Sequence, residues 1–414
     1  MLQRHARTAE RVGAFAPFSV PHFGKIYMGG MLWSVCRWGL GFLGAYFVNQ
    51  RTHSPRLVQL TGTMMWAPLL FAGLIGGSLA DRFDRRRIVL AQFSTLMPLV
   101  GLIGFASLTN HLEVWMIFPF QICIGVGWVI DMTARRALVY DLVGDQYVNG
   151  AMALEQFASS LGLAGGALAG GSIIGGLGIA WAYIAVAACM SVALLVLARL
   201  PAGISQQSAP RAAAVVRPTL RSTLTDGLRM LPSNPALVSV LGVTLIVNLF
   251  HFSYFPIVTV IAQRVFASPF LTGLLAAATG FGMATGALAV AVFQPSRGRV
   301  YVIGSFLGFG ALVGFAEFRS YWAVFLSLYL ASCGVGLYGA AQSALVLTAT
   351  DEARRGRAMG LLSMAIGGLP VGMYLLGEAA QRVGAPTALL ASNVAGAVVL
   401  ILFLRRRPEV FHID

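Results

Sequence analysis

Three ionisable residues, Arg37, Asp131 and Glu155, lie inside long apolar stretches of the chain. A charge near the centre of a lipid bilayer costs about 2.5–3.5 kcal/mol on insertion scales, so such residues normally face a cavity or an oppositely charged partner. Burial favours the neutral form of a carboxyl group, and a nearby cation favours its charged form. A carboxyl group that gains and loses a cationic neighbour can therefore release and take up a proton.

Both carboxylates also have structural explanations. Asp131 stands four residues before Arg135, the spacing at which opposite charges pair on one helix face. Glu155 lies near the end of its apolar stretch, where it could meet Arg135 or Arg136. We predict that Asp131 is the proton-coupling group, with Arg37 as its switching partner and Glu155 as the next acid. The structural pairings remain open alternatives at this stage.

Uncharged polar and aromatic residues follow the same apolar stretches. Asn248, His251 and Tyr254 are spaced three apart just before Pro256, so they fall on one helix face. A buried histidine often has only a structural role, and tryptophans often only pack. The predicted substrate-binding residues are Arg37, Trp33, Trp128, Asn248, His251, Tyr254, Tyr329, Tyr338 and Gln342.

The elements that carry these residues must be membrane helices. The chain has 414 residues, of which 57% are hydrophobic and only 11% are charged, whereas soluble domains have roughly 25% charged residues. A spanning helix needs about 20 apolar residues. The sequence predicts twelve, at 26–49, 57–80, 88–108, 113–134, 149–174, 179–198, 236–262, 270–293, 300–318, 320–346, 357–380 and 385–404.

Arginine and lysine positions predict the orientation of these helices. With the N-terminus inside, inside segments hold 23 basic residues and outside loops hold five, the bias that sets membrane topology. The predicted order is a cytoplasmic tail at 1–25, a bundle at 26–198, a cytoplasmic linker at 199–235, a bundle at 236–404 and a cytoplasmic tail at 405–414. Leu220 to Leu231 have the leucine spacing of a short amphipathic helix. The basic residues are dispersed, so no nucleic-acid partner is expected.

An internal repeat relates the two halves. Ala137–Val139 recurs as Ala344–Val346, and three of the four residues Ala151–Leu154 recur in Ala358–Leu361, both at an offset of 207 residues. Since each copy contains an even number of spans, the copies run in the same direction, related by an axis along the membrane normal. The fold class predicted is an all-α membrane protein with two pseudo-symmetric six-helix bundles.

The loop after the second span carries the residues of a known signature. Gly77–Arg87 is similar to the G-x-x-x-D-R-x-G-R-R/K motif of the major facilitator superfamily, with Asp84 at the second glycine position. Ala134–Leu138 followed by Asn149–Leu154, together with Arg355–Gly360, resembles the branch with enterobactin exporters and some macrolide efflux proteins. The resemblance implies that the first, fourth, seventh and tenth helices line a central cavity.

The same motif predicts a conformational latch. Asp81 would gain stabilisation beside Arg135 or Arg136, or at the positive helix N-terminus near Gly356. The predicted latch residues are Gly77, Asp81, Arg82, Arg135, Arg136 and Gly356, whereas Arg85, Arg86 and Arg87 are expected only to fix topology. The fifth span, with five glycines between Gly162 and Gly171, resembles the antiporter motif of proton-coupled exporters but has Ala167 in place of its proline. Close helix packing is the alternative explanation.

These observations predict a multi-pass protein of the cell inner (plasma) membrane, and not an enzyme, because no paired carboxylates or activated nucleophile occur together. We predict a monomeric secondary transporter that exports a small organic molecule, a siderophore or a drug, by alternating access. The chain lacks the nucleotide-binding signature G-x-x-x-x-G-K-[ST], so its driving force should be a proton gradient, with no bound cofactor. Its partners would be the substrate and membrane lipid. The alternatives are an importer or facilitator of an anionic metabolite, which Arg37 would suit, and a sensor derived from a transporter.

Overall fold

The computed structural model describes residues 15–71, 84–201, 229–317, 320–351 and 354–413, and all regular structure in these ranges is helical. The first half contains η1 (Ala16–Ser19), α1 (Phe23–Thr52), α2 (Pro55–Trp66), η2 (Ala67–Phe71), α4 (Arg85–Leu108), α5 (Val114–Ile130), η3 (Asp131–Arg135), α6 (Arg136–Leu177) and α7 (Ile179–Ala198). The second half contains α9 (Pro235–Ile246), η4 (Val247–His251), η5 (Phe252–Tyr254), α10 (Ile257–Phe266), α11 (Pro269–Phe293), α12 (Arg297–Glu317), α13 (Tyr321–Thr348), α14 (Arg355–Ile366), α15 (Gly368–Val383), α16 (Ala385–Arg406) and η7 (Pro408–His412).

Several helices begin where a capping side chain precedes a proline. Ser54, Asn234 and Ser268 each accept a hydrogen bond from the backbone N–H three residues later, and each is followed by proline. The side-chain oxygen satisfies an N–H that has no partner inside the helix. Proline suits the next position because its fixed φ is helical and its missing N–H is not needed there. These local signals set the starts of α2, α9 and α11.

Eleven helices in the described part of the chain are long and apolar enough to cross a membrane. They match eleven of the twelve predicted spans. The first half of the remaining span, predicted at 57–80, forms α2 and η2, and its residues 72–80 lie outside the described ranges. The predicted end of the fourth span at 134 is too early, since helix continues to Gly144. Gly144, with φ of 65° and ψ of −178°, interrupts the helix there.

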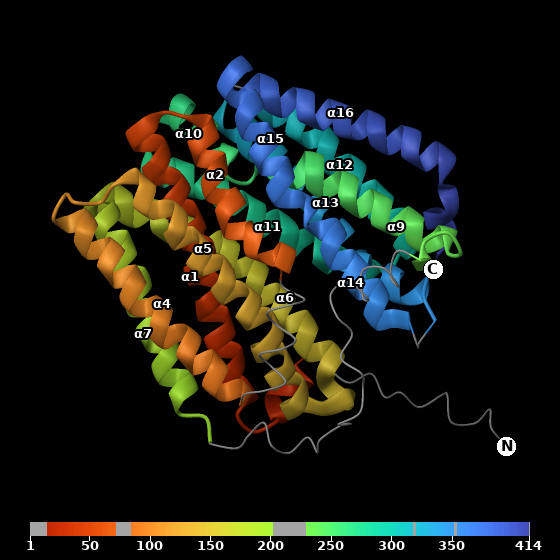
Figure 1. The fold of residues 1–414 in the computed structure, drawn as a ribbon, viewed down its shortest axis with the longest axis horizontal. Helices are drawn as coiled ribbons and strands as arrows, with labels where there is room; N and C mark the ends of the chain where they lie inside the picture. The colour runs from red at the N-terminus through yellow and green to blue at the C-terminus, as the bar shows by residue number, and fades with distance from the viewer. Residues whose placement is uncertain (1–14, 72–83, 202–228, 318–319, 352–353, 414) are drawn as a thin grey trace.

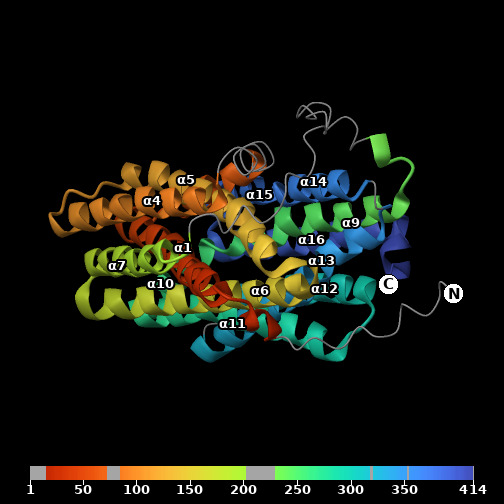
Figure 2. The same cartoon turned by 90° about the horizontal axis from the view of Figure 1, so that it is seen from below.

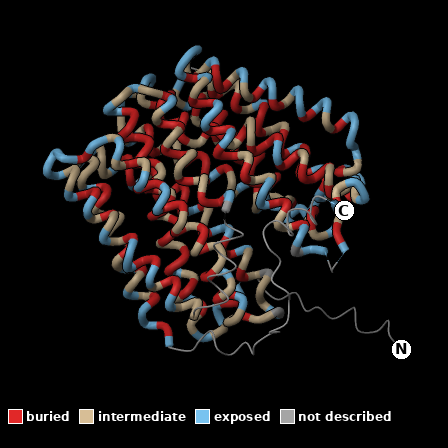
Figure 3. The backbone as a smooth tube through the Cα atoms, viewed as in Figure 1, coloured by how far each residue is buried: buried red, intermediate tan, exposed pale blue. Residues whose placement is uncertain are grey.

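The helices form two bundles, as the repeat predicts (Figures 1 and 2). Helices α1, α2 and α4 to α7 pack together, and α9 to α16 form the second bundle. The repeated segments occupy matching places, since Ala137–Val139 and Ala344–Val346 lie in the linker-side ends of the fourth and tenth spans. Large apolar residues such as Trp115, Leu195 and Phe293 are exposed. Buried residues gather between the helices, and exposed residues lie mostly along their outer sides (Figure 3). This is the distribution expected of a lipid-facing protein.

Glycines allow the closest helix contacts. A Cβ at Gly166 would collide with α1 at the Val35 carbonyl, and one at Gly280 on α11 would collide with α6 at Ala164. Gly171 of α6 faces Gly273 of α11 across the two bundles in the same way. Close packing therefore explains Gly166 and Gly171 of the glycine-rich fifth span.

The two bundles are joined at one end. We call this the loop end, because it carries the turns around residues 53, 267 and 384, and we call the other the linker end. Hydrogen bonds and an ion pair join the bundles in the loop-end half of the molecule, including Asn49–Gln263, Ser54–Gln381 (2.8 Å) and Gln59 to the Ser253 carbonyl (2.8 Å). Toward the linker end, α6 and α14 diverge (Figure 1).

Candidate functional site

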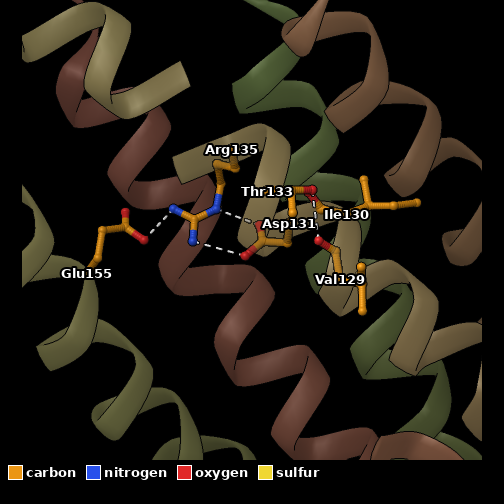
Figure 4. Close-up of polar contacts among 6 residues, drawn as sticks. All are labelled: Val129, Ile130, Asp131, Thr133, Arg135 and Glu155. Atoms are coloured by element: carbon orange, nitrogen blue, oxygen red, sulfur yellow. Dashed lines mark hydrogen bonds and ion pairs between the residues drawn. The ribbon is translucent and has the colours of Figure 1, made fainter. Parts of the chain in front are cut away.

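A buried ionic triad lies near the linker end of the first bundle (Figure 4). Arg135 donates through Nε to Asp131 Oδ1 at 2.5 Å and through Nη2 to Oδ2 at 3.0 Å. Its Nη1 lies 2.5 Å from Glu155 Oε2 of α6. That contact lacks hydrogen-bond alignment, since Nη1 has no hydrogen-bond partner, so it acts as an ion pair. All three side chains are at most 6% exposed.

The local backbone explains how Asp131 and Arg135 meet. They begin and end the π-helical turn η3, a wide turn that is rare and often found at functional sites. The Thr133 hydroxyl donates to the carbonyls of Val129 (2.9 Å) and Ile130 (3.1 Å) next to this turn. Gly30 of α1 lies against the Arg135 guanidinium, where any side chain would collide with it. Helix α1 therefore packs directly over the triad.

The two carboxylates are not equivalent. Asp131 has both oxygens bound by Arg135. Glu155 has Oε2 beside Arg135, while its buried Oε1 has no hydrogen-bond partner among the described residues. The triad thus holds one saturated and one half-satisfied carboxylate. The structural pairings that the sequence left open, Asp131 with Arg135 and Glu155 with Arg135, are confirmed.

Arg37 does not pair with Asp131 in this conformation, so the predicted switching partnership, in which the two meet in one state and separate in the other, stays a prediction. Its guanidinium stacks over the rings of Trp38 (4.1 Å to the centroid) and Trp128 (4.6 Å). Its Nη1 is buried without a hydrogen-bond partner in the described part of the chain. The physical reason is that Arg135, one turn along the same helix, already occupies both oxygens of Asp131. Cation–π contact then stabilises Arg37 instead.

The structure describes only part of the predicted latch. Gly77, Asp81 and Arg82 lie outside the described ranges. Arg135 is engaged in the triad, Arg136 is exposed, and Gly356 belongs to the first turn of α14. Arg85 does more than fix topology, because it binds Asp141 and the Ala137 carbonyl (3.3 Å) of α6. Sequence reasoning missed Asp141, although an acid five residues after Arg136 was a usable signal.

The predicted substrate-binding residues of the second bundle mostly bind one another. Tyr338 accepts hydrogen bonds from Gln342 Nε2 (2.5 Å) and Asn248 Nδ2 (3.3 Å) and stacks on Tyr301 with centroids 4.6 Å apart. Thr244 and Tyr301 share a hydrogen bond of 2.6 Å. This network joins the seventh, ninth and tenth spans. Its members Asn248 and Tyr338 are buried.

The other predicted substrate-binding residues also have partners inside a bundle. His251 Nδ1 lies 3.2 Å from Asn393 Oδ1, and the ring packs against Gly308. The Tyr254 hydroxyl shares a 3.1 Å hydrogen bond with Ser332, and Tyr329 donates to Thr285 at 2.9 Å. The remaining two are tryptophans: Trp33 packs on Phe93, and Trp128 meets Trp66 edge to face at 4.5 Å.

A cavity lies between the two bundles, lined by residues of both. None of the predicted substrate-binding residues is among its lining residues in the described structure. Sequence reasoning missed this wall because it is largely apolar, although Gln121, a polar residue within the fourth span, was a usable signal. Its lining residues are Trp38, Gly41, Phe42, Ala45, Thr61, Gly62, Met65, Trp66, Gln121, Leu163, Ala167, Phe255, Pro256, Val258, Thr259, Ala276 and Thr279.

Comparison with known families decides the identity of this arrangement. The family model described as "Transmembrane secretion effector" matches residues 12–412. The chain belongs to this family of the major facilitator superfamily. The two bundles of membrane helices, with a cavity between them, are therefore the architecture of a membrane transporter. The predicted superfamily is confirmed.

Curated relatives cover most of the chain. The enterobactin exporter EntS of Salmonella choleraesuis (strain SC-B67) is 27% identical over 381 residues, which cover 88% of this chain and 87% of the relative. EntS of Escherichia coli (strain K12) is 27% identical over 386 residues, covering 90% and 89%.

Solved transporters share the fold. The nucleoside transporter NupG aligns with a TM-score of 0.71 at 14% identity, covering 93% of this chain and 98% of that one. A bacterial homolog to the human lysosomal transporter Spinster aligns with a TM-score of 0.67 at 14% identity, covering 95% and 96%. At these identities the likeness extends to the fold alone.

Proposed function

We propose that this transporter is a proton-coupled exporter of a small organic molecule, a siderophore or a drug, that works by alternating access. The observation that carries the proposal is the asymmetric closure of the molecule. The bundles are joined at the loop end by Asn49–Gln263 and the contacts around it, and the interfacial cavity lies below this closed end. Such a state exposes a site to one side of the membrane, which is half of an alternating-access cycle.

We place the transporter in the inner membrane of the cell, with its linker end facing the cytoplasm. The support is the bias of 23 basic residues against five. The observed conformation would then be inward-facing, ready to load a cytoplasmic substrate. Export of a siderophore is supported by relatives named as enterobactin exporters.

Proton coupling is proposed at the triad of Asp131, Arg135 and Glu155. Glu155 Oε1 offers an unpartnered, buried oxygen, and a proton added there neutralises a carboxylate without displacing the Arg135–Asp131 hydrogen bonds. When Arg135, in the fourth span, moves relative to the fifth span, Glu155 loses its cation and gains affinity for the proton. No cofactor is required by this scheme.

Counterflow in proteoliposomes tests the proposal. The purified chain would be reconstituted and given a panel of siderophores and drugs, with and without an imposed pH gradient. We expect exchange of at least one compound without a gradient and its uphill movement only with one. Absence of flux for every compound would contradict transport of this class and favour a sensor.

One observation favours a second candidate, a facilitator of an anionic metabolite. Arg37 is buried at mid-helix with Nη1 unpartnered, so an anion could bind there. If carboxylate compounds cross at a rate that does not depend on the pH gradient, and if this flux disappears in Arg37→Gln, this alternative is established instead.

A further inference from the structure

The wall of the interfacial cavity is aromatic and uncharged. The cavity is lined by four aromatic residues and one methionine: Trp38, Phe42, Met65 and Trp66 of the first bundle and Phe255 of the second. The Trp38 ring centroid is 6.2 Å from that of Trp66 and 5.8 Å from that of Phe255. Flat aromatic surfaces of this kind provide large apolar contact area and favour stacking with other rings. The cavity is therefore suited to a planar apolar group.

None of the lining residues that the structure describes carries a charge. Moving an ion from water to such a wall would leave it without a counter-charge, which is strongly unfavourable. Arg37, the buried cation beside this wall, stacks over Trp38 but is not itself a lining residue. The cavity should thus discriminate against a charged group at this position.

Two polar atoms of the wall have no partner. Gln121 is fully buried, and its Nε2 donates to the Leu40 carbonyl of α1 at 3.2 Å, which leaves Oε1 as a free acceptor. Trp38 Nε1 is a buried donor without a hydrogen-bond partner. A buried polar atom left unpaired is unfavourable, because it has lost its hydrogen bonds to water. A ligand that supplies a donor to Gln121 recovers part of that cost.

The cavity is closed toward the loop end. Asn49 lies one turn beyond the lining residue Ala45 on α1, Gln263 lies one turn beyond the lining residue Thr259 on α10, and the two side chains are hydrogen-bonded. Gly62 of α2 packs against Pro256 of the other bundle. A molecule that reaches the cavity from the linker end is therefore stopped there.

We propose that this cavity binds an uncharged, planar aromatic group of the transported molecule, one that carries a hydroxyl or N–H donor for Gln121 Oε1. The assignment rests on the proposed transport function for its occupant, and it names a site distinct from the residues that sequence analysis selected.

Equilibrium dialysis of the purified full chain against matched empty micelles tests the chemistry with three probes. They are 1-naphthol, 1-methoxynaphthalene, which lacks the donor, and naphthalene-1-sulfonate, which is an anion. Gln121→Leu should weaken naphthol binding about three- to tenfold, the effect of one neutral hydrogen bond, and leave methoxynaphthalene unchanged. The sulfonate should bind at least about tenfold more weakly than naphthol to the wild type, because its charge has no partner in the wall.

A matched pair of variants locates the site. Ala276 lines the cavity, whereas Ala291 is exposed on the same helix α11. Ala276→Phe should abolish binding of both uncharged probes, and Ala291→Phe should leave it at the wild-type level. Unchanged binding in Ala276→Phe, or tight sulfonate binding that Arg37→Gln abolishes, would overturn the proposal.

Binding and transport are read separately. If the probes follow the expected pattern but no compound moves in proteoliposomes, the cavity assignment stands and the transport proposal fails. If pH-driven flux occurs while Gln121→Leu and Ala276→Phe, both monodisperse, bind the uncharged probes like wild type, the cavity assignment fails alone.

Discussion

Arg135 is the residue on which the first bundle's buried charges depend. It satisfies both oxygens of Asp131 and one of Glu155, and all three side chains are removed from water. Breaking a buried ion pair by removing one partner typically costs about 3–5 kcal/mol. The two acids should therefore respond differently to neutralisation, since Asp131 makes the hydrogen bonds that hold Arg135 and Glu155 makes only an ion pair.

We expect Glu155→Gln to abolish uphill, pH-driven transport while exchange stays near wild type, because exchange needs no net proton movement. Asp131→Asn should instead lower the melting temperature and the yield of folded protein, because Arg135 loses its bidentate partner. Paired counterflow and gradient-driven assays, with thermal unfolding of both variants, make the comparison. A stable Asp131→Asn that exchanges substrate but has lost coupling would return the proton site to Asp131.

The polar network of the second bundle gives another test at this scale. Tyr338→Phe keeps the stack on Tyr301 and removes the hydroxyl that accepts from Asn248 and Gln342. Its loss should lower the free energy of unfolding by about 1–2 kcal/mol without changing the Kd for substrate. Tyr374→Phe, at an exposed tyrosine of α15, is the control. A changed Kd at unchanged stability would show that Tyr338 binds substrate after all, as the sequence predicts.

Sequence could predict which residues share a helix face but not what that face meets. The spacing of Asp131 and Arg135 gave their ion pair, because both lie on one helix. Tyr338 and Gln342, four residues apart, also share one helix face, but that face meets Tyr301 and Thr244 of the same bundle and not the cavity. The rotation of a helix about its own axis depends on packing between helices, which a single sequence does not contain.

Helix existence was predictable because membrane spanning requires long apolar runs. The Ser-Pro and Asn-Pro pairs at the starts of α2, α9 and α11 were a usable signal for helix starts that hydropathy alone does not contain. The end of the fourth span was not predictable, because α6 continues past the arginines to Gly144, outside the apolar run. The π-turns η3 and η4 were also invisible to hydropathy. Nothing in residue composition separates a π-turn from the α-helix around it.

The contact between α6 and α11 should control closure between the bundles. Gly280→Leu would force a side chain into the backbone of α6 near Ala164, so α6 and α11 must separate and the closed state must lose stability. Transport should fall, and a cysteine introduced at Ala45 should become more reactive from the loop end. Gly310→Leu is the matched control, because nothing lies within 4 Å of its added Cβ. Wild-type reactivity in Gly280→Leu would mean that this contact does not govern closure.

At the scale of the whole molecule, the duplicated sequence predicted two similar bundles, but their polar interiors differ. The first bundle holds a charged triad, and the second holds neutral tyrosine, threonine and amide groups. Arg37 and Asp131 correspond, at the repeat offset, to Thr244 and Tyr338, neither of which is ionised near neutral pH. The proposed coupling groups therefore all lie in the first bundle, and the repeat-related positions of the second bundle are uncharged.

The orientation of the whole molecule is the last expectation to be tested. If the linker end is cytoplasmic, as the distribution of basic residues predicts, cysteines at Ser222 in the linker and at the exposed Gln156 of α6 should resist an impermeant maleimide in intact cells. Both should react in inverted membrane vesicles. A cysteine at His111, in the exposed turn between α4 and α5 at the loop end, should show the opposite pattern.

Two contrary outcomes have different meanings, because Gln156 lies in the linker-end half and Ser222 reports the linker itself. Reaction of both from outside would invert the topology and turn the observed state into an outward-facing one. Reaction of Gln156 alone from outside would keep the topology and place an opening at the loop end that the Asn49–Gln263 contact is proposed to close.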